Sequence, residues 1–317
     1  MLRFVLSRVV LLLLGLVVAS ALIFFTLRLL SGDVAQVIAG TQGTPAQVAA
    51  IRRSLGLDRP LVVQYGAWLG GLVHGDLGRS LVTGSSVSSQ LVQKMSVTLP
   101  LAGLALVFGL AFGVPLGVIS ALNRRRIGGT ALSVIAQALA AVPAVWGGMI
   151  LIAVFAVQLK LLPTQGYPTA GWAQPGLALR SLILPALTIG IIEGAVILRF
   201  TRSATLDALG QDYVRTAAAK GLTRTQAVIR HGLPNVMLSV VSVLGVQIAG
   251  LLVGAVLVEQ LFALPGVGRM LVSDVGVRDL TKVQGELFAL TGLVLVLGFA
   301  VDIVHRLVDP RQRAVDS

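Results

Sequence analysis

Few side chains in this 317-residue sequence could do covalent chemistry. There is no cysteine, so the chain has neither a disulfide nor a thiolate nucleophile. Its three histidines, His74, His231 and His305, are far apart along the chain and predict neither a metal cluster nor a catalytic triad. The phosphate-binding pattern G-x-x-x-x-G-K-[ST] does not occur either. We therefore expect a protein that is not an enzyme and that binds no metal or cofactor itself.

One ionisable residue has an unusual place, because Glu193 lies near the middle of the apolar stretch ILPALTIGIIEGAVILRF. A carboxylate within a membrane is costly unless it faces water or a partner, and such groups commonly belong to transport pathways. Gln137 and Gln247 also lie in apolar stretches and could share a polar interior with Glu193. The three side chains could line a translocation pathway, or Glu193 could be protonated or hydrogen-bonded and only hold helices together. The sequence leaves both interpretations open.

The chain around these residues is strongly apolar, with 56% hydrophobic and 12% charged residues and a mean hydropathy of +0.91. A helix needs about 20 apolar residues to cross a bilayer. Hydropathy predicts six such spans, at Val9–Leu30, Leu99–Leu122, Ala131–Leu159, Ser181–Phe200, Met237–Val258 and Leu287–Val308. The first should be an uncleaved anchor, because its hydrophobicity continues beyond a possible signal-peptide cleavage site. We expect an all-α polytopic membrane protein.

Basic residues predict the orientation of these spans. The net charge is +12, and Lys and Arg gather in the N-terminal tail, the turn 123–126, the segment 199–236 and the C-terminal tail. Such residues favour the cytoplasmic side, so both termini and the segment 201–236 are predicted to be cytoplasmic. A nucleic-acid partner is not expected, because the charges have no interleaved aromatic residues.

The segment 31–98 should lie outside the cytoplasm and is too long to be a simple connector. Thr44 and Pro45 predict a helix start, and Gly56 predicts its end. Leu61–Val73 carries an apolar stripe at helical spacing, which is typical of an interfacial or packing helix. These helices could only cap the bundle, or they could form a docking surface or an entrance for solute.

Within the spans, small residues predict close helix packing and prolines predict kinks or span starts. Glycines recur at every fourth position, at Gly109, Gly113 and Gly117 and at Gly250 and Gly254. The prolines are Pro115, Pro143 and Pro185.

The polar interruption DALGQDYVRTAAAKGLTRTQAVIRHGLPN has a helical pattern of its own. Gln211–Ala219 favours a helix, and Gly221 can end it in a left-handed conformation. A second short helix should run from Thr223 to His231 and end before Pro234. We expect a rigid elbow whose aromatic residue and alanine face could dock into a groove on another protein.

The spacing in this elbow resembles a known motif. In binding-protein-dependent ABC importer permeases, the EAA loop reads E-A-A-x3-G-x9-I-x-L-P, and here Gly221 precedes Leu233 and Pro234 by the same spacing. The stretches QDYVRTAAAKGL and RHGLPN are similar to the dipeptide, oligopeptide and nickel branch of this family.

The resemblance extends over nearly the whole chain, with local departures. Similar stretches are LGLDRPLVVQYGAWLGGLVHGDLGRSL (55–81), LLPTQGY (161–167), LVEQLFALPGVGRML (257–271) and LVDPR (307–311). Arg215-Thr216-Ala217 stands where the general pattern has Glu-Ala-Ala, and His231 stands at the isoleucine. SGDV (31–34) stands where the family often has PGDP.

The resemblance implies the type I ABC importer permease fold with six transmembrane helices. The first unit would be the tail and span 1–30, followed by an extracytoplasmic helical segment 31–98 and a core bundle 99–317 that contains the coupling loop 201–236. In a bacterial plasma membrane, the chain would join a second homologous permease and two cytoplasmic ATPases that bind ATP and Mg²⁺. An extracytoplasmic solute-binding protein would deliver the solute.

The match also implies site residues and a substrate class. The ATPase-coupling residues would be Asp212, Tyr213, Arg215, Thr216, Ala217, Ala218, Lys220, Gly221, Leu233 and Pro234. The solute would be a di- or oligopeptide that crosses by alternating access. A nickel chelate or another small solute of the same family is the alternative. A proton-coupled secondary transporter using Glu193 is less favoured, because the sequence lacks inverted repeats and further ionisable groups in its spans.

Overall fold

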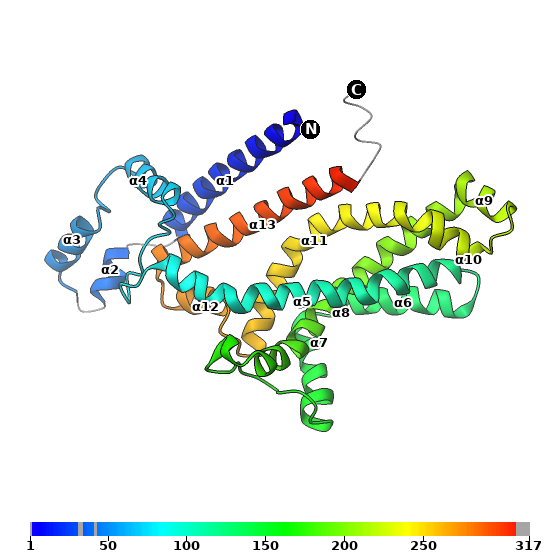
Figure 1. Ribbon diagram of the computed structural model, residues 1–317. Helices are drawn as coiled ribbons and strands as arrows, with labels where there is room; N and C mark the ends of the chain where they lie inside the picture. The colour runs from blue at the N-terminus through cyan, green and yellow to red at the C-terminus, as the bar shows by residue number, and fades with distance from the viewer. Residues whose placement is uncertain (1, 31–33, 41–42, 309–317) are drawn as a thin grey trace. The chain divides into compact units, whose positions relative to one another are not determined.

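The computed structural model describes residues 2–30, 34–40 and 43–308, which form helices joined by loops (Figure 1). The chain divides into two compact units. Unit 1 contains residues 1–97 and 266–296, and unit 2 contains residues 98–265 and 297–317, as far as these are described. Of the segments compared with the family by sequence, parts of SGDV and LVDPR, residues 31–33 and 309–311, lie outside the described residues.

Unit 1 contains the N-terminal span and the predicted extracytoplasmic helices. Its elements are α1 (Leu2–Leu30), α2 (Val34–Ala39), α3 (Pro45–Ser54), α4 (Leu61–Val73), the start of α5 (Val87–Leu122), α12 (Val267–Gly276) and the first part of α13 (Leu280–Val308). Of these, α2 and α12 were not predicted. With only six and ten residues, they show too few turns for a clear helical period.

The predicted boundaries of α3 are confirmed by its caps. The Thr44 hydroxyl accepts a hydrogen bond from the backbone N–H of Gln47 at 3.3 Å, and the Gln47 side chain accepts one from the backbone N–H of Thr44 at 2.9 Å. Pro45 occupies the first turn, where its missing N–H costs nothing. Gly56 follows the helix with a φ of +63°, a conformation that favours glycine.

Aromatic side chains hold α4 against α1. The Phe24 ring lies 5.5 Å from the Tyr65 ring and 6.0 Å from the Trp68 ring, measured between centroids. The hydroxyls of Ser20 and Tyr65 are 2.9 Å apart and share a hydrogen bond. Trp68 also meets Phe288 edge to face at 5.8 Å. Of the apolar stripe predicted for Leu61–Val73, Tyr65 and Trp68 therefore pack within unit 1, whereas Val62 and Val73 remain exposed.

Unit 2 is built around one long helix. Its elements are the rest of α5, α6 (Ile127–Ala141), α7 (Ala144–Leu151), a π-helical turn (Ile152–Gln158), α8 (Pro175–Gly210), α9 (Asp212–Ala219), α10 (Arg224–Ala227), a second π-helical turn (Val228–Gly232), α11 (Leu233–Leu261) and the end of α13. Helix α8 contacts α6, α7 and α11. In the most apolar part of α8, 67% of the residues are buried, against 22% for α5 and 22% for the span that contains α11, so α8 is the centre of unit 2.

The third predicted span, Ala131–Leu159, is a bent pair of helices, which confirms the break predicted at Pro143. Helix α6 ends at Ala141, Pro143 precedes α7, and the two halves are bent by 106°. Pro143 has no backbone N–H and its ring clashes with the preceding turn, so the helix breaks there. By length and composition, the described residues contain five helices able to cross a membrane, or six if this bent pair counts as one span.

The other predicted spans are confirmed but lie within longer helices. Helix α5 begins at Val87 rather than Leu99, and α8 continues to Gly210 rather than ending at Phe200. Hydropathy detects only the apolar part of a helix, whereas the backbone hydrogen bonds continue into polar sequence. Pro115 and Pro185 lie inside α5 and α8 without ending either helix.

The predicted close packing at the glycines of α5 is confirmed. A Cβ atom built at Gly113 would lie 2.6 Å from the backbone oxygen of Gly194 in α8, and one at Gly117 would lie 2.7 Å from Thr201 Cβ. At Gly109 a Cβ would lie 3.4 Å from Gly194 N, an ordinary contact, so the closest approach is at Gly113 and Gly117. Figure 1 shows α5 running beside α8. The two backbones therefore approach too closely for larger side chains at these positions.

Candidate functional site

The elbow follows directly on the polar end of α8. Gln211 follows α8 in an extended conformation with φ of −79° and ψ of 148°, which turns the chain into α9. Helix α9 ends at Ala219, as predicted, and Gly221 adopts a φ of +96°. Such a left-handed conformation is unfavourable for residues with a Cβ, which is why the stop signal at Gly221 could be read from sequence.

The second helix of the elbow begins as predicted but does not end where predicted. Thr223 accepts a hydrogen bond from the N–H of Gln226 at 3.3 Å, and the Gln226 side chain accepts one from the N–H of Thr223 at 3.0 Å. The chain then continues through the π-helical turn into α11, with Pro234 in the first turn. The expected end before Pro234 is wrong, because the wider π turn lets the helical path continue into a residue without a backbone donor.

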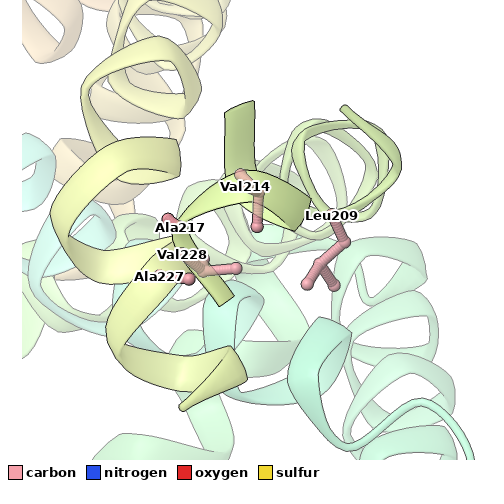
Figure 2. Packing of buried hydrophobic residues seen from close by; sticks show 5 residues of the cluster. All are labelled: Leu209, Val214, Ala217, Ala227 and Val228. Carbon is pink, nitrogen blue, oxygen red and sulfur yellow. The ribbon is translucent and has the colours of Figure 1, made fainter. Parts of the chain in front are cut away.

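A small hydrophobic core holds the elbow to the end of α8. The buried side chains of Leu209, Val214, Ala217, Ala227 and Val228 point toward one another from α8, α9, α10 and the π turn (Figure 2). Three partly buried leucines, Leu122, Leu206 and Leu222, pack around them. Because interiors packed in this way resist local deformation, the elbow and the end of α8 form one rigid body.

The sequence-predicted coupling residues fall on both faces of the elbow. Most are exposed: Asp212, Tyr213, Arg215, Thr216, Ala218, Lys220, Gly221 and Pro234. Leu233 is half-buried, and Ala217 lies in the core described above. Of the alanines named from sequence, Ala218 is therefore available to another protein, whereas Ala217 supports the elbow. The Asp212–Arg215 ion pair, at 3.7 Å, is solvent-exposed and contributes little to stability.

A polar hollow of about 490 Å³ lies beside the elbow. Asn235 Nδ2 donates a hydrogen bond to Tyr213 Oη at 3.1 Å and so joins α9 to the first turn of α11. Ser242 Oγ and His305 Nε2 are 2.8 Å apart and join α11 to the end of α13. All four residues line the hollow.

The structure brings together two of the three predicted pathway residues. Gln247 Nε2 on α11 donates a hydrogen bond to Glu193 Oε2 on α8 at 2.5 Å. Gly250 lies directly behind the carboxylate, since a Cβ there would be 3.2 Å from Glu193 Oε1. Gln137, however, is exposed on α6 and does not join this pair among the described contacts. The arrangement can present a carboxylate and an amide to a polar or cationic group between two spans.

Sequence reasoning missed a buried carboxylate in unit 2. Glu259 is fully buried in α11 and accepts a hydrogen bond from Thr98 Oγ1 at 2.6 Å. Its position in the apolar run LLVGAVLVEQLFALP was a signal of the same kind as that of Glu193.

Unit 1 contains a buried charged cluster that was also not predicted. Lys282 Nζ lies 2.8 Å from Asp274 Oδ2, Ser80 Oγ donates to Asp279 Oδ2, and Glu286 is fully buried. Asp279, Lys282 and Glu286 recur at intervals of three and four residues and so share one helical face, a signal that the sequence offered. Within the described part of the chain, no group of three His, Cys, Asp or Glu residues could hold a metal ion.

Two family profiles together match most of the chain. Residues 113–314 match the binding-protein-dependent transport system inner membrane component, and residues 1–102 match the N-terminal part of binding-protein-dependent transport system membrane components. In a solved structure of the MetNI methionine ABC transporter in an inward-facing conformation, one chain superposes with a TM-score of 0.57 at 20% identity. The match covers 69% of this chain and 96% of that one, and it shows a shared fold.

Curated relatives align over nearly their full length. The dipeptide transport system permease protein DppB of Escherichia coli is 36% identical, with 99% of both chains covered. The glutathione transport system permease protein GsiC of Escherichia coli is also 36% identical over 99% of both chains. A putative peptide transport system permease protein of Brucella abortus is 38% identical over 93% of this chain and 94% of its own. The chain is therefore a multi-pass membrane protein with the type I ABC importer permease fold, and it belongs to the family of inner membrane components of binding-protein-dependent transport systems.

Proposed function

We propose that this chain is one permease subunit of an ATP-driven importer that moves di- or oligopeptides into the cytoplasm by alternating access. The observation that carries the proposal is the exposed α9, which a hydrophobic core fastens to the end of α8. The substrate class is supported by the relatives, whose names describe dipeptide, peptide and glutathione transport.

The partners follow from the same family. A second homologous permease would complete the pathway, and two cytoplasmic ATPases would bind ATP and Mg²⁺. A solute-binding protein would deliver peptide to the outer face, where we place the segment 31–98. The excess of Lys and Arg in the tails and in 199–236 supports a plasma-membrane topology with both termini and the coupling loop 201–236 in the cytoplasm.

The coupling mechanism is a mechanical one. Exposed residues of α9 would sit in a groove of an ATPase, and the core around Val214 and Val228 would pass its movement to α8 and α11. A second buried cluster, which includes Ile197, Val236 and Val240, joins these two helices and would make them move together. ATP can drive this switch only by binding one arrangement of the subunits more tightly than the other.

The pathway would run past the polar pair between α8 and α11. Glu193 could bind the cationic group of a peptide, and Gln247 would keep the carboxylate oriented through their hydrogen bond. Gln137, exposed on α6, would belong to the pathway only where α6 faces it in the assembled importer.

The test uses the tagged full chain, purified with its subunits from native membranes and reconstituted into liposomes. Peptide uptake and ATP hydrolysis would be measured for the wild type, for Ala218→Trp on the exposed face of α9, and for Arg125→Trp as a matched control. Arg125 is exposed in the turn 123–126, outside the elbow. We expect Ala218→Trp to abolish uptake while the permease still binds the loaded solute-binding protein, and Arg125→Trp to transport normally.

Two results would contradict the proposal. Normal ATP-driven uptake by Ala218→Trp would show that α9 is not the coupling helix. Uptake by the chain alone, driven by a proton gradient without ATP, would instead support a secondary transporter that uses Glu193. Transport of nickel chelates without transport of peptides would leave the coupling mechanism intact and change only the substrate.

A further inference from the structure

A hollow of about 310 Å³ lies entirely within unit 1 and has no role in the proposed coupling. Helix α1, helix α4, the loop before α5 and the first turn of α13 contribute to its wall. Its polar lining consists of Arg28, Gln64, Trp68, Arg79, Thr281 and Gln284.

Three of the side chains that line this hollow each carry a buried polar atom without a hydrogen-bond partner among the described residues. These atoms are Arg28 Nε, Gln64 Oε1 and Trp68 Nε1. The orientation of the Gln64 amide is set by its nitrogen, which donates to the backbone oxygens of Leu57 at 3.3 Å and Arg59 at 2.8 Å. Buried polar groups in native proteins are almost always hydrogen-bonded, so three such side chains around one hollow favour a polar ligand there.

The charges of the wall define the chemistry of that ligand. Two guanidinium groups, of Arg28 and Arg79, line the hollow, and no carboxylate is among its lining residues in the described chain. The Arg28 guanidinium lies 5.3 Å from the centre of the Phe24 ring, which limits its freedom. Arg28 and Trp68 require an acceptor, whereas Gln64 Oε1 requires a donor. A phosphodiester that also carries a hydroxyl group meets both needs.

The surroundings of the hollow favour a lipid as the source of this group. Arg28 lies in the last turn of the apolar helix α1, and α1 presents apolar side chains such as Leu22 and Leu29 to the surface, 63% and 90% exposed. Tyr65 and Trp68 add the aromatic residues that are typical of the headgroup level. We propose that this hollow binds the headgroup of an anionic phospholipid with a hydroxyl donor, such as phosphatidylglycerol, while its acyl chains lie along α1.

The experiment measures lipid retention by the full chain. The wild type would be placed in nanodiscs of equal parts phosphatidylglycerol and phosphatidylcholine. Native mass spectrometry would then count the lipids that stay bound to the protein after it is released from the nanodisc. Arg28→Gln and Arg79→Gln remove the two lining charges, and Arg53→Gln removes an exposed charge on α3 away from the hollow. We expect one retained phosphatidylglycerol in the wild type and in Arg53→Gln, and about tenfold weaker retention for each lining variant.

A second pair of variants keeps the test decisive if an arginine variant does not fold. Trp68→Phe keeps the aromatic packing and removes only the N–H donor, so it should weaken retention about threefold to tenfold. Gln64→Glu adds a negative charge to the hollow and should abolish retention. Unchanged retention in both folded variants would overturn the proposal.

Further arms separate the lipid from other occupants. Retention of phosphatidylcholine as strong as that of phosphatidylglycerol would overturn the proposal. Binding of soluble glycerol 3-phosphate in phosphatidylcholine nanodiscs, at concentrations that displace phosphatidylglycerol, would show that the ligand is a free phosphate.

Discussion

Replacing Gly113 by alanine should force α5 and α8 apart and lower the stability of unit 2. The added Cβ would lie 2.6 Å from Gly194 O and 2.8 Å from Ile197 Cβ, whereas ordinary contacts begin at 3.4 Å. The clash involves backbone on the α8 side, so rotation of a flexible side chain cannot relieve it. The helices must therefore move, and a gap of about 0.5–1 Å forfeits a quarter to a half of the dispersion energy of the atom pairs involved.

The magnitude follows from a matched control on the same helix. Gly103 has no atom within 4 Å of a Cβ built on it, so Gly103→Ala gains only the helix propensity of alanine, about 1 kcal/mol. Gly113→Ala has the same gain together with an overpacking cost of about 1–3 kcal/mol. The propensity gain cancels in the comparison, so Gly113→Ala should be less stable than Gly103→Ala by about 1–3 kcal/mol.

The assay is unfolding of the purified full chain by titration with sodium dodecyl sulfate in mixed micelles, followed by circular dichroism. The midpoint of Gly113→Ala should lie below those of the wild type and of Gly103→Ala. If Gly113→Ala were as stable as Gly103→Ala, the close backbone contact between α5 and α8 would not exist in the membrane protein.

Three other perturbations test the elbow, the pathway and the buried charges. Glu193→Gln keeps the hydrogen bond to Gln247 and should lower uptake of cationic peptides about tenfold in a folded protein, because a hydrogen bond to a charged group is worth about 1.5–3 kcal/mol. Unchanged uptake would restrict Glu193 to packing. Gly221→Ala should destabilise the elbow by about 1–2 kcal/mol and reduce ATP-coupled uptake, because the φ of Gly221 is +96°. Gly210→Ala, the control, should do neither, and equal uptake by the two variants would refute the strain argument. Asp274→Asn removes the carboxylate that lies 2.8 Å from the buried Lys282 ammonium and should cost about 3–5 kcal/mol in the same unfolding assay; a variant as stable as the wild type would refute a buried charge pair.

Local chemistry explains why much of the elbow could be predicted from its sequence. The left-handed conformation at Gly221 and the cap at Thr223 depend on neighbouring residues alone. The continuation through Pro234 could not be predicted, because it depends on a π turn that packs against α8. The different positions of Ala217 and Ala218 also required the fold, since only the packing partners decide which face of α9 is buried.

The sequence by itself determined the membrane class, the long apolar helices and the local helix ends, because hydropathy and backbone conformation are properties of short segments. Only the tertiary structure decided that Glu193 meets Gln247 and leaves Gln137 on the surface of α6. It also decided the 106° bend after Ala141 and the approach of α5 to α8. Apolar spans are nearly equivalent to one another in lipid, so their neighbours and rotations are selected by close contacts between small residues and by buried hydrogen bonds, which join residues far apart in the chain.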